Sequence, residues 1–213
     1  MCAMQLHTPA LHPVQFTVAP PGRFTRQQLL VRFVAALALG LFGLSFATFF
    51  ALAYCFLPAY AAARIGALGS NRDYLREDGD RVLTFLRGFA AVSAWFGLAT
   101  EHLPTRDPGE TVSLAVDDDV PRATAGQALL RILTGLPSAL VLMMLCWIGL
   151  LVWLWATLSI LISERMPPGA FTFLVGLQRW SVRLLAYQAS LVDAYPPFSL
   201  FEPHNATPPA IVL

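Results

Sequence analysis

Two long apolar runs, separated by polar segments, dominate the pattern of this chain. No charged residue occurs from Phe33 to Ala63 or from Ile132 to Ser163. Each run exceeds the roughly 20 residues that a helix needs to cross the hydrocarbon core of a bilayer. A helix of such length must tilt, bend or extend beyond the bilayer, and Pro58 and Pro137 are the expected places for a bend or an entry turn. Both runs are therefore predicted to be embedded in a membrane.

A polar break and a helix of mixed character follow each run. The breaks read RIGALGSNRDYLREDGDR and SERMPPG, and the helices after them are predicted over residues 81–100 and 170–192. These helices are apolar enough to enter a bilayer, but the first contains Arg87 and the second contains Arg179 and Arg183. They either span the membrane while facing a protein interior or lie in the interface with their arginines reaching the headgroups. The sequence alone does not separate these two arrangements.

The chain also contains an internal repeat. Residues 23–32 read RFTRQQLLVR and residues 122–131 read RATAGQALLR, and their identities include arginine, threonine and glutamine, so apolar composition alone does not produce them. The pairs that match at an offset of 99 are Arg23 and Arg122, Thr25 and Thr124, Gln28 and Gln127, Leu30 and Leu129, Arg32 and Arg131, Leu37 and Leu136, and Leu41 and Leu140. A weaker match at an offset of 92 pairs Arg87 with Arg179, Trp95 with Tyr187, Glu101 with Asp193, and Pro104 with Pro196.

A short β-capable stretch precedes each repeat. The stretches VQFTVAPPG and ETVSLAVDDD alternate in polarity, which predicts one edge strand each, paired with one another outside the membrane. The predicted fold is an all-α integral membrane protein built from two related helical units, with short extramembrane β strands. Its parts are an extramembrane N-terminal segment (1–22), a first membrane unit (23–104), an extramembrane linker with a short strand (105–121), a second membrane unit (122–201) and a tail (202–213).

The repeat also carries a prediction about topology. Matching polar residues indicate that both units meet the same environments, which requires an even number of crossings in each unit. The amino end, residues 101–131 and the carboxyl tail would then lie on one side of the membrane. In the alternative, the second helices are interfacial and residues 101–131 lie opposite both ends.

Composition supports a membrane protein and gives no indication of an enzyme. Of the 213 residues, 56% are hydrophobic and only 13% are charged, against about 25% charged in soluble domains. The net charge of +1 gives no electrostatic basis for binding nucleic acid. The histidines lack metal-ligand spacing, and no phosphate loop or nucleophile–base set is visible. No catalytic, metal or cofactor site is therefore predicted.

The second half resembles a known family. An apolar helix is followed by a Pro-Gly turn, an Arg-Trp with a second Arg, a Tyr, and Asp-x-Tyr-Pro-Pro-Phe. These residues are Pro168, Gly169, Arg179, Trp180, Arg183, Tyr187, Asp193, Tyr195, Pro196, Pro197 and Phe198. This pattern, over residues 120–201, resembles the bacterial membrane proteins called the domain of unknown function 4389 family. The first half departs from it, since Gly88 and Ala91 stand where the pattern has tryptophan and arginine. The resemblance implies a bacterial membrane protein whose motif occurs once, and it implies no activity.

The motif has a physical interpretation as an anchor. Arg179, Arg183, Tyr187 and Ser190 would form one polar stripe along the last helix. Pro196 and Pro197 would stop this helix, because proline cannot continue it. In this interpretation Tyr195 and Phe198 lie at headgroup depth, where aromatic residues are enriched.

Asp193 requires a separate explanation. A carboxylate in the last turn of a helix opposes the helix dipole, so Asp193 is expected to pair with a nearby arginine. Arg122 and Arg131, from the segment that leads into the second unit, are the two candidates. The pair would hold the final helix against the start of its own unit.

The predicted function is non-catalytic. We expect a multi-pass protein of the bacterial cytoplasmic (inner) membrane that acts as a scaffold or accessory subunit, packing against another membrane protein or organising lipid. Trp147, Trp153 and Trp155 offer an aromatic face for such packing. The alternative is a small transporter or a lipid- or anion-handling protein that uses Arg179 and Arg183. The candidate contact residues are Arg179, Trp180, Arg183, Tyr187, Asp193, Tyr195, Pro196, Pro197, Phe198, Arg122 and Arg131.

Overall fold

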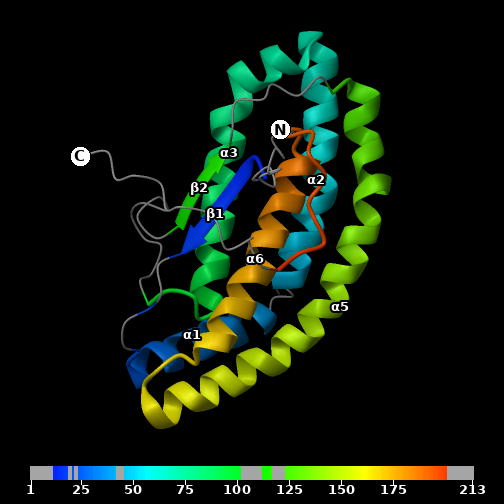
Figure 1. Ribbon diagram of the computed structural model, residues 1–213. Coiled ribbons are helices and arrows are strands. Elements are labelled where there is room, and N and C mark those ends of the chain that lie inside the picture. The colour runs from blue at the N-terminus through cyan, green and yellow to red at the C-terminus, as the bar shows by residue number, and fades with distance from the viewer. Residues whose placement is uncertain are drawn as a thin grey trace, which may run out of the picture.

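The computed structural model describes residues 12–18, 21, 24–41, 46–101, 112–116 and 123–200, and within them it has five helices and two strands (Figure 1). In chain order these elements are β1 (Val14–Val18), α1 (Arg26–Leu41), α2 (Phe46–Leu68), α3 (Asn71–Phe96), β2 (Val112–Val116), α5 (Ala125–Ser163) and α6 (Pro168–Gln188). The mostly helical fold agrees with the sequence prediction.

The two apolar runs form different helices. The first run is divided between α1 and α2, whereas the second forms α5, a single curved helix of 39 residues (Figure 1). Pro58 lies inside α2 and Pro137 lies inside α5, and both helices continue past the proline. Helix α5 is about 58 Å long at 1.5 Å per residue, which is well beyond the hydrocarbon thickness of a bilayer.

The first polar break is much shorter than predicted. Helix α3 begins at Asn71, not near residue 81, and only Gly69 and Ser70 separate it from α2. Gly69 has a φ of 82°, which suits glycine at the end of a helix. The Ser70 side chain then accepts a hydrogen bond from the backbone N–H of Asp73 (3.2 Å) and caps the start of α3. These two local signals outweigh the polar composition of the segment.

An ion-pair network holds the α2–α3 hairpin together near its turn. Arg64 of α2 pairs with Asp78 of α3 and also reaches Glu77 (2.9 Å), while Arg81 contacts Asp78 at 3.2 Å. The Arg64 guanidinium beside Asp78 holds the pKa of that carboxyl below its usual value. Asp78 is therefore ionised at neutral pH although its side chain is covered by its neighbours.

The two helical hairpins, α2–α3 and α5–α6, pack against each other in opposite directions. The Tyr54 hydroxyl of α2 donates to the carbonyl of Ile132 near the start of α5 (2.6 Å), and Gly66 near the end of α2 lies beside Ala125. At the far end of α5, Glu164 lies 3.9 Å from Arg26 of α1. The first residues of α1 and of α5 thus lie at opposite ends of the bundle of helices (Figure 1). If α5 crosses a membrane, the prediction that both units begin on the same side is wrong.

The two strands form an antiparallel pair, in agreement with the alternation in the sequence. Val14 lies opposite Val116 and Val18 lies opposite Val112. The pair packs on α3 and α6, on the side away from α2 and α5, so that the molecule has a sheet layer and two helical layers (Figure 1). The location of the strands outside the membrane stays a prediction.

A seam of mostly small residues lets α5 approach its neighbours closely. Five of the eight buried positions of α5 recur every seven residues, which is the spacing of a helix that packs along one line against other helices. They are Ala128, Gly135, Leu142, Gly149 and Ala156. A Cβ atom at Gly135 would lie 2.3 Å from the buried Gln188 amide nitrogen of α6, so a larger side chain here would force the Gln188 amide away from the carbonyl of Arg131 to which it donates.

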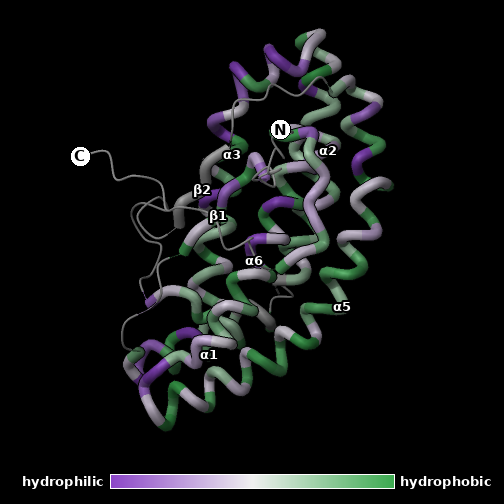
Figure 2. Tube along the Cα trace, viewed as in Figure 1, coloured by the Kyte–Doolittle hydropathy of each residue, from purple (hydrophilic) through white to green (hydrophobic). Residues whose placement is uncertain are grey.

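The rest of the α5 surface is apolar and exposed. Figure 2 shows apolar residues along most of this helix, and only 17% of its most apolar 18-residue window is buried. Trp147 is 70% exposed and Trp155 is also exposed, whereas Trp153 turns inward and donates its indole N–H to the carbonyl of Phe96 (2.9 Å). The predicted aromatic face is therefore smaller, because Trp153 belongs to the core.

Candidate functional site

Helix α5 begins with a capping box that positions the site. The Thr124 hydroxyl accepts from the backbone N–H of Gln127 (3.3 Å), and the Gln127 side chain accepts from the backbone N–H of Thr124 (2.9 Å). This arrangement starts the helix at a defined residue. Arg131, seven residues after the cap, is thereby directed toward the end of α6.

Helix α6 ends earlier than the sequence predicted. Its last residue is Gln188, and Ser190 has a φ of 56°, in the left-handed region. The N–H of Leu191 then donates to the carbonyl of Ala186 (3.1 Å), which turns the chain back over the helix end. Asp193 is therefore not in the last turn of a helix, and Pro196 and Pro197 do not stop α6. The helix-dipole reason given for the Asp193 pair was wrong, and Ser190 is not part of a helical stripe.

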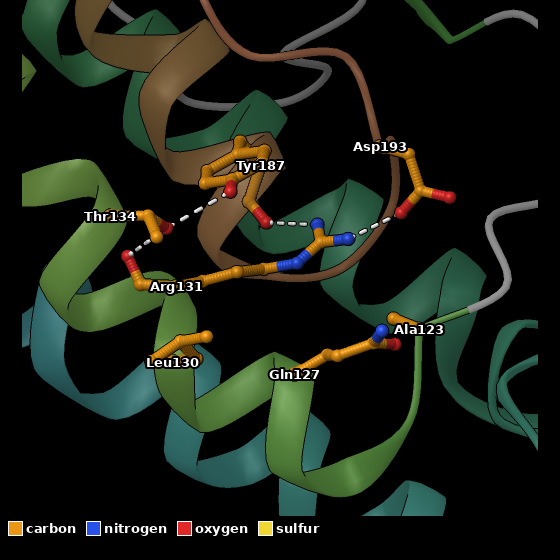
Figure 3. A pocket seen from close by; sticks show the side chains of 7 residues that line it. All are labelled: Ala123, Gln127, Leu130, Arg131, Thr134, Tyr187 and Asp193. Carbon is orange, nitrogen blue, oxygen red and sulfur yellow. Dashed lines mark hydrogen bonds and ion pairs between the residues drawn. The ribbon is translucent and has the colours of Figure 1, made fainter.

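Arg131 nevertheless pairs with Asp193, and it joins the ends of α5 and α6. One terminal nitrogen donates to the carbonyls of Tyr187 and Val192 (both 2.6 Å), and the other pairs with the Asp193 carboxylate (Figure 3). The guanidinium carbon lies 4.5 Å from the centre of the Tyr187 ring. The Arg131 side chain is 7% exposed and that of Asp193 is 53% exposed. A cation at the carboxyl end of a helix is favourable. The other candidate partner, Arg122, lies outside the described residues.

A pocket of about 320 Å³ opens beside this pair (Figure 3). Its lining residues are Ala123, Gln127, Leu130, Arg131, Thr134, Tyr187 and Asp193. The hydroxyls of Thr134 and Tyr187 share a hydrogen bond of 3.0 Å at one edge. Gln127 and Thr134 were not among the predicted site residues, although the Thr-x-x-Gln spacing of the capping box could have pointed to Gln127.

Arg179 and Arg183 have a structural role that the sequence did not indicate. Arg179 donates to the carbonyl of Phe16 and Arg183 donates to the carbonyl of Val14, each at 3.1 Å. Four residues of helix rise about 6 Å and two residues of strand about 6.8 Å, so the two guanidinium groups match two carbonyls on one edge of β1. Burial and the nearby charge of Arg183 lower the pKa of His12, which precedes this strand.

The carboxyl-terminal aromatic motif packs back onto α5 and α6. The Ser138 hydroxyl of α5 donates to the Tyr195 hydroxyl (2.8 Å), whose ring meets that of Tyr187 edge-on at 5.5 Å. Phe198 meets Trp180 edge-on at 5.6 Å. Pro196 is buried and Pro197 is exposed. Tyr195 and Phe198 both retain exposed surface. Their location at the depth of the lipid headgroups stays a prediction.

Another buried arginine, Arg32, lies near the opposite end of the helices from Arg131. Arg32 of α1 is 1% exposed and donates to the carbonyl of Thr100. Its guanidinium carbon lies 5.0 Å from the centre of the Phe24 ring and 5.1 Å from that of Trp95. Burial lowers the pKa of Arg32 to about 10, although Glu101 opposes the shift. Arg32 thus remains a cation at neutral pH.

Within the described part of the chain, no group of three or more His, Cys, Asp or Glu side chains could hold a metal ion.

These features define a mostly helical protein with two helices long and apolar enough to cross a membrane, and with an arginine–aspartate pair at one helix end. Residues 126–199 match the family model described as Domain of unknown function (DUF4389), which confirms the resemblance of the second half. No curated protein and no solved structure matches the chain significantly. The match covers all but the first residue of α5, all of α6 and the whole Asp-x-Tyr-Pro-Pro-Phe segment after them, so it includes Arg131 and Asp193.

The Arg131–Asp193 pair can be tested by substitution. Asp193→Asn should lower the free energy of unfolding by about 2 kcal/mol, because the buried Arg131 charge loses its carboxylate. Asp80→Asn, at an exposed position of α3, should change it by less than about 1 kcal/mol. Thermal unfolding of the detergent-solubilised protein measures both. The loss in Asp193→Asn combined with Arg131→Met should be smaller than the sum of the two single losses. An Asp193→Asn protein as stable as the wild type would contradict a structural role for the pair.

Proposed function

We propose that this protein is an integral, multi-pass protein of the bacterial cytoplasmic membrane and acts as a non-catalytic scaffold or accessory subunit. The observation that carries the proposal is the surface of α5, which buries a seam of mostly small residues and exposes apolar side chains around most of its circumference. A core helix of a soluble protein would be mostly buried, whereas only 17% of the most apolar 18-residue window of α5 is buried. Lipid and the apolar surface of another membrane protein are the environments that suit such a helix.

We also propose that the chain consists of two related units. Thr25 and Gln28 form the same capping box as Thr124 and Gln127, with distances of 3.4 and 3.1 Å. In each unit the arginine seven residues after the cap donates to a backbone carbonyl that follows α3 or α6. Arg32 donates to Thr100, and Arg131 donates to Val192, which lies 92 positions later in the chain.

The ends of α3 and α6 support the same correspondence. Leu98 and Ser190, again 92 positions apart, are both in the left-handed region, with φ of 59° and 56°. The following N–H groups, of Ala99 and Leu191, donate to carbonyls five residues earlier. Neither position is a glycine, so chance agreement of two uncommon conformations is a poor explanation.

Several contacts favour the scaffold role over the transport or anion-binding alternative. Arg179 and Arg183, on which that alternative depends, donate to backbone carbonyls of β1. The Arg131 charge faces a carboxylate. These three arginines therefore support the fold, and the exposed side chains of α5 are left as the surface for association.

Membrane integration has a direct test. Alkaline carbonate washing of membranes should leave the protein in the pellet, because the exposed apolar surfaces of α2 and α5 require a hydrocarbon environment. A peripheral membrane protein of the same host should be released under the same conditions. Recovery of this chain in the supernatant would contradict the proposal as a whole.

The antiparallel arrangement predicts the sides of the two helical turns. In a protein without Cys2, Cys55 and Cys146, single cysteines at the exposed positions Arg72 and Arg165 should react with an impermeant reagent from opposite sides of the membrane. Arg72 lies just after the α2–α3 turn and Arg165 lies within the α5–α6 turn, and these two turns are at opposite ends of the helices (Figure 1). Labelling of both cysteines from the same side would indicate that the helices lie along the membrane surface or that each unit crosses the membrane an even number of times.

The scaffold role is tested on the exposed face of α5. Trp147→Ala should leave thermal unfolding unchanged, since the side chain is 70% exposed, but should reduce the size of the complex that mild detergent extracts from native membranes. Phe56→Ala, at an exposed aromatic position of α2, is the matched control and should leave the complex intact. Wild-type protein that migrates as a single chain in native electrophoresis would contradict a scaffold role.

A further inference from the structure

The pocket beside Arg131 corresponds to a filled position in the first half of the chain. Phe24 and Ala123 each directly precede the threonine that caps a helix, 99 positions apart, and both are buried. Because the two capping boxes are alike, the Cβ atoms at these positions point in similar directions relative to the helix that follows. The Phe24 ring lies 5.0 Å from the Arg32 guanidinium carbon.

The second unit keeps one of the two rings that surround the arginine. Tyr187 lies against the Arg131 guanidinium at 4.5 Å, as Trp95 lies against that of Arg32 at 5.1 Å. Position 123 is alanine, which has no ring, and Ala123 lines the pocket of about 320 Å³. In Figure 3 the Arg131 side chain runs between Tyr187 and Asp193 on one side and Gln127 and Ala123 on the other. The open space of the pocket therefore lies on the side of the Arg131 guanidinium that is turned toward Ala123 (Figure 3).

We propose that this pocket binds an aromatic ring, which stacks on the Arg131 guanidinium in the place that Phe24 takes beside Arg32. The proposal rests on the proposed correspondence of the two units, and it does not depend on the membrane location or the scaffold role. A ring over a guanidinium is attracted by its charge, and this attraction grows where water is excluded. Arg131 is nearly buried, so the position satisfies this condition.

The lining selects a ring with a polar substituent. Leu130 provides an apolar wall, while Gln127 and Thr134 place an amide and a hydroxyl at the margin, where they can bond a phenolic hydroxyl. An anion is a poorer occupant, because Asp193 already neutralises the Arg131 charge and is 53% exposed beside the pocket. Phenol combines an aromatic ring with a hydroxyl, so it is the simplest molecule that has the groups this pocket would bind.

The experiment compares phenol with cyclohexanol, which also carries one hydroxyl and has a similar size but has no aromatic ring. Binding to the full-length protein in nanodiscs is measured by ligand-observed NMR for the wild type, Ala123→Phe and Phe24→Ala. Ala123→Phe places a ring in the pocket from within the chain, as Phe24 does in the first unit. Phe24→Ala opens the corresponding space beside Arg32. Because all samples contain the same lipid, ring uptake by the bilayer is common to them and cancels in the comparison.

The wild type should bind phenol about tenfold more tightly than cyclohexanol, and Ala123→Phe should lose this preference while unfolding at a higher temperature. Phe24→Ala should bind a second phenol. Equal binding of phenol to the wild type and Ala123→Phe would overturn the proposal, as would an Ala123→Phe protein that fails to fold, since the pocket would then have no room for a ring. If the membrane or scaffold predictions fail while this pattern holds, only the proposed location and role are lost.

The natural source of the ring is distinguished with protein purified from native membranes. A small ring-bearing molecule should appear in an organic extract of the wild type and be absent from that of Ala123→Phe. An aromatic side chain of a partner should instead leave the extracts identical, while Ala123→Phe loses a protein that the wild type retains. Identical extracts together with identical associated proteins would overturn a natural role for the site.

Discussion

The structure depends on how a buried guanidinium is satisfied at the end of a helix pair. Arg131 is the last charged residue before the uncharged run of α5, and it is almost completely covered. Burying such a charge is costly unless it is paired and hydrogen-bonded. Here the carbonyls of Tyr187 and Val192 and the carboxylate of Asp193 meet that requirement. Because all three acceptors come from the end of α6 and the chain after it, the arginine determines where α6 stops relative to the start of α5.

The sequence predicted the helical elements better than their limits and their relative directions. The apolar runs and the strand alternation can be read from local composition. The pairing of Asp193 with one of two arginines was also predicted, but from a place in the last helical turn that Asp193 does not occupy. The end of α6 could not be predicted, because Ser190 adopts a left-handed conformation that its side chain does not favour. The early start of α3 depends on a cap at Ser70 and on the contacts of Asp78 with Arg64, which join two helices and leave no periodic signal.

The candidate site was predicted only in part, for a related reason. Tyr187, Asp193 and Arg131 were among the predicted residues, and the structure brings them together at one pocket. The roles expected for Arg179 and Arg183 were different, because the sequence does not reveal that β1 lies along α6. A basic side chain on an apolar helix suggests a lipid or a ligand, yet a backbone carbonyl from a distant strand satisfies it equally well.

The arginines that hold β1 also have a consequence for the order of events during synthesis. Arg179 and Arg183 are separated from their acceptors in β1 by 163 and 169 residues. At roughly 5–20 residues per second, about 8 to 34 s pass between the synthesis of β1 and the synthesis of these side chains. Strand β2 emerges earlier and can pair with one edge of β1 during this interval. The two carbonyls on β1 lack these arginine donors until most of α6 has been made, so β1 completes its contacts only late in synthesis.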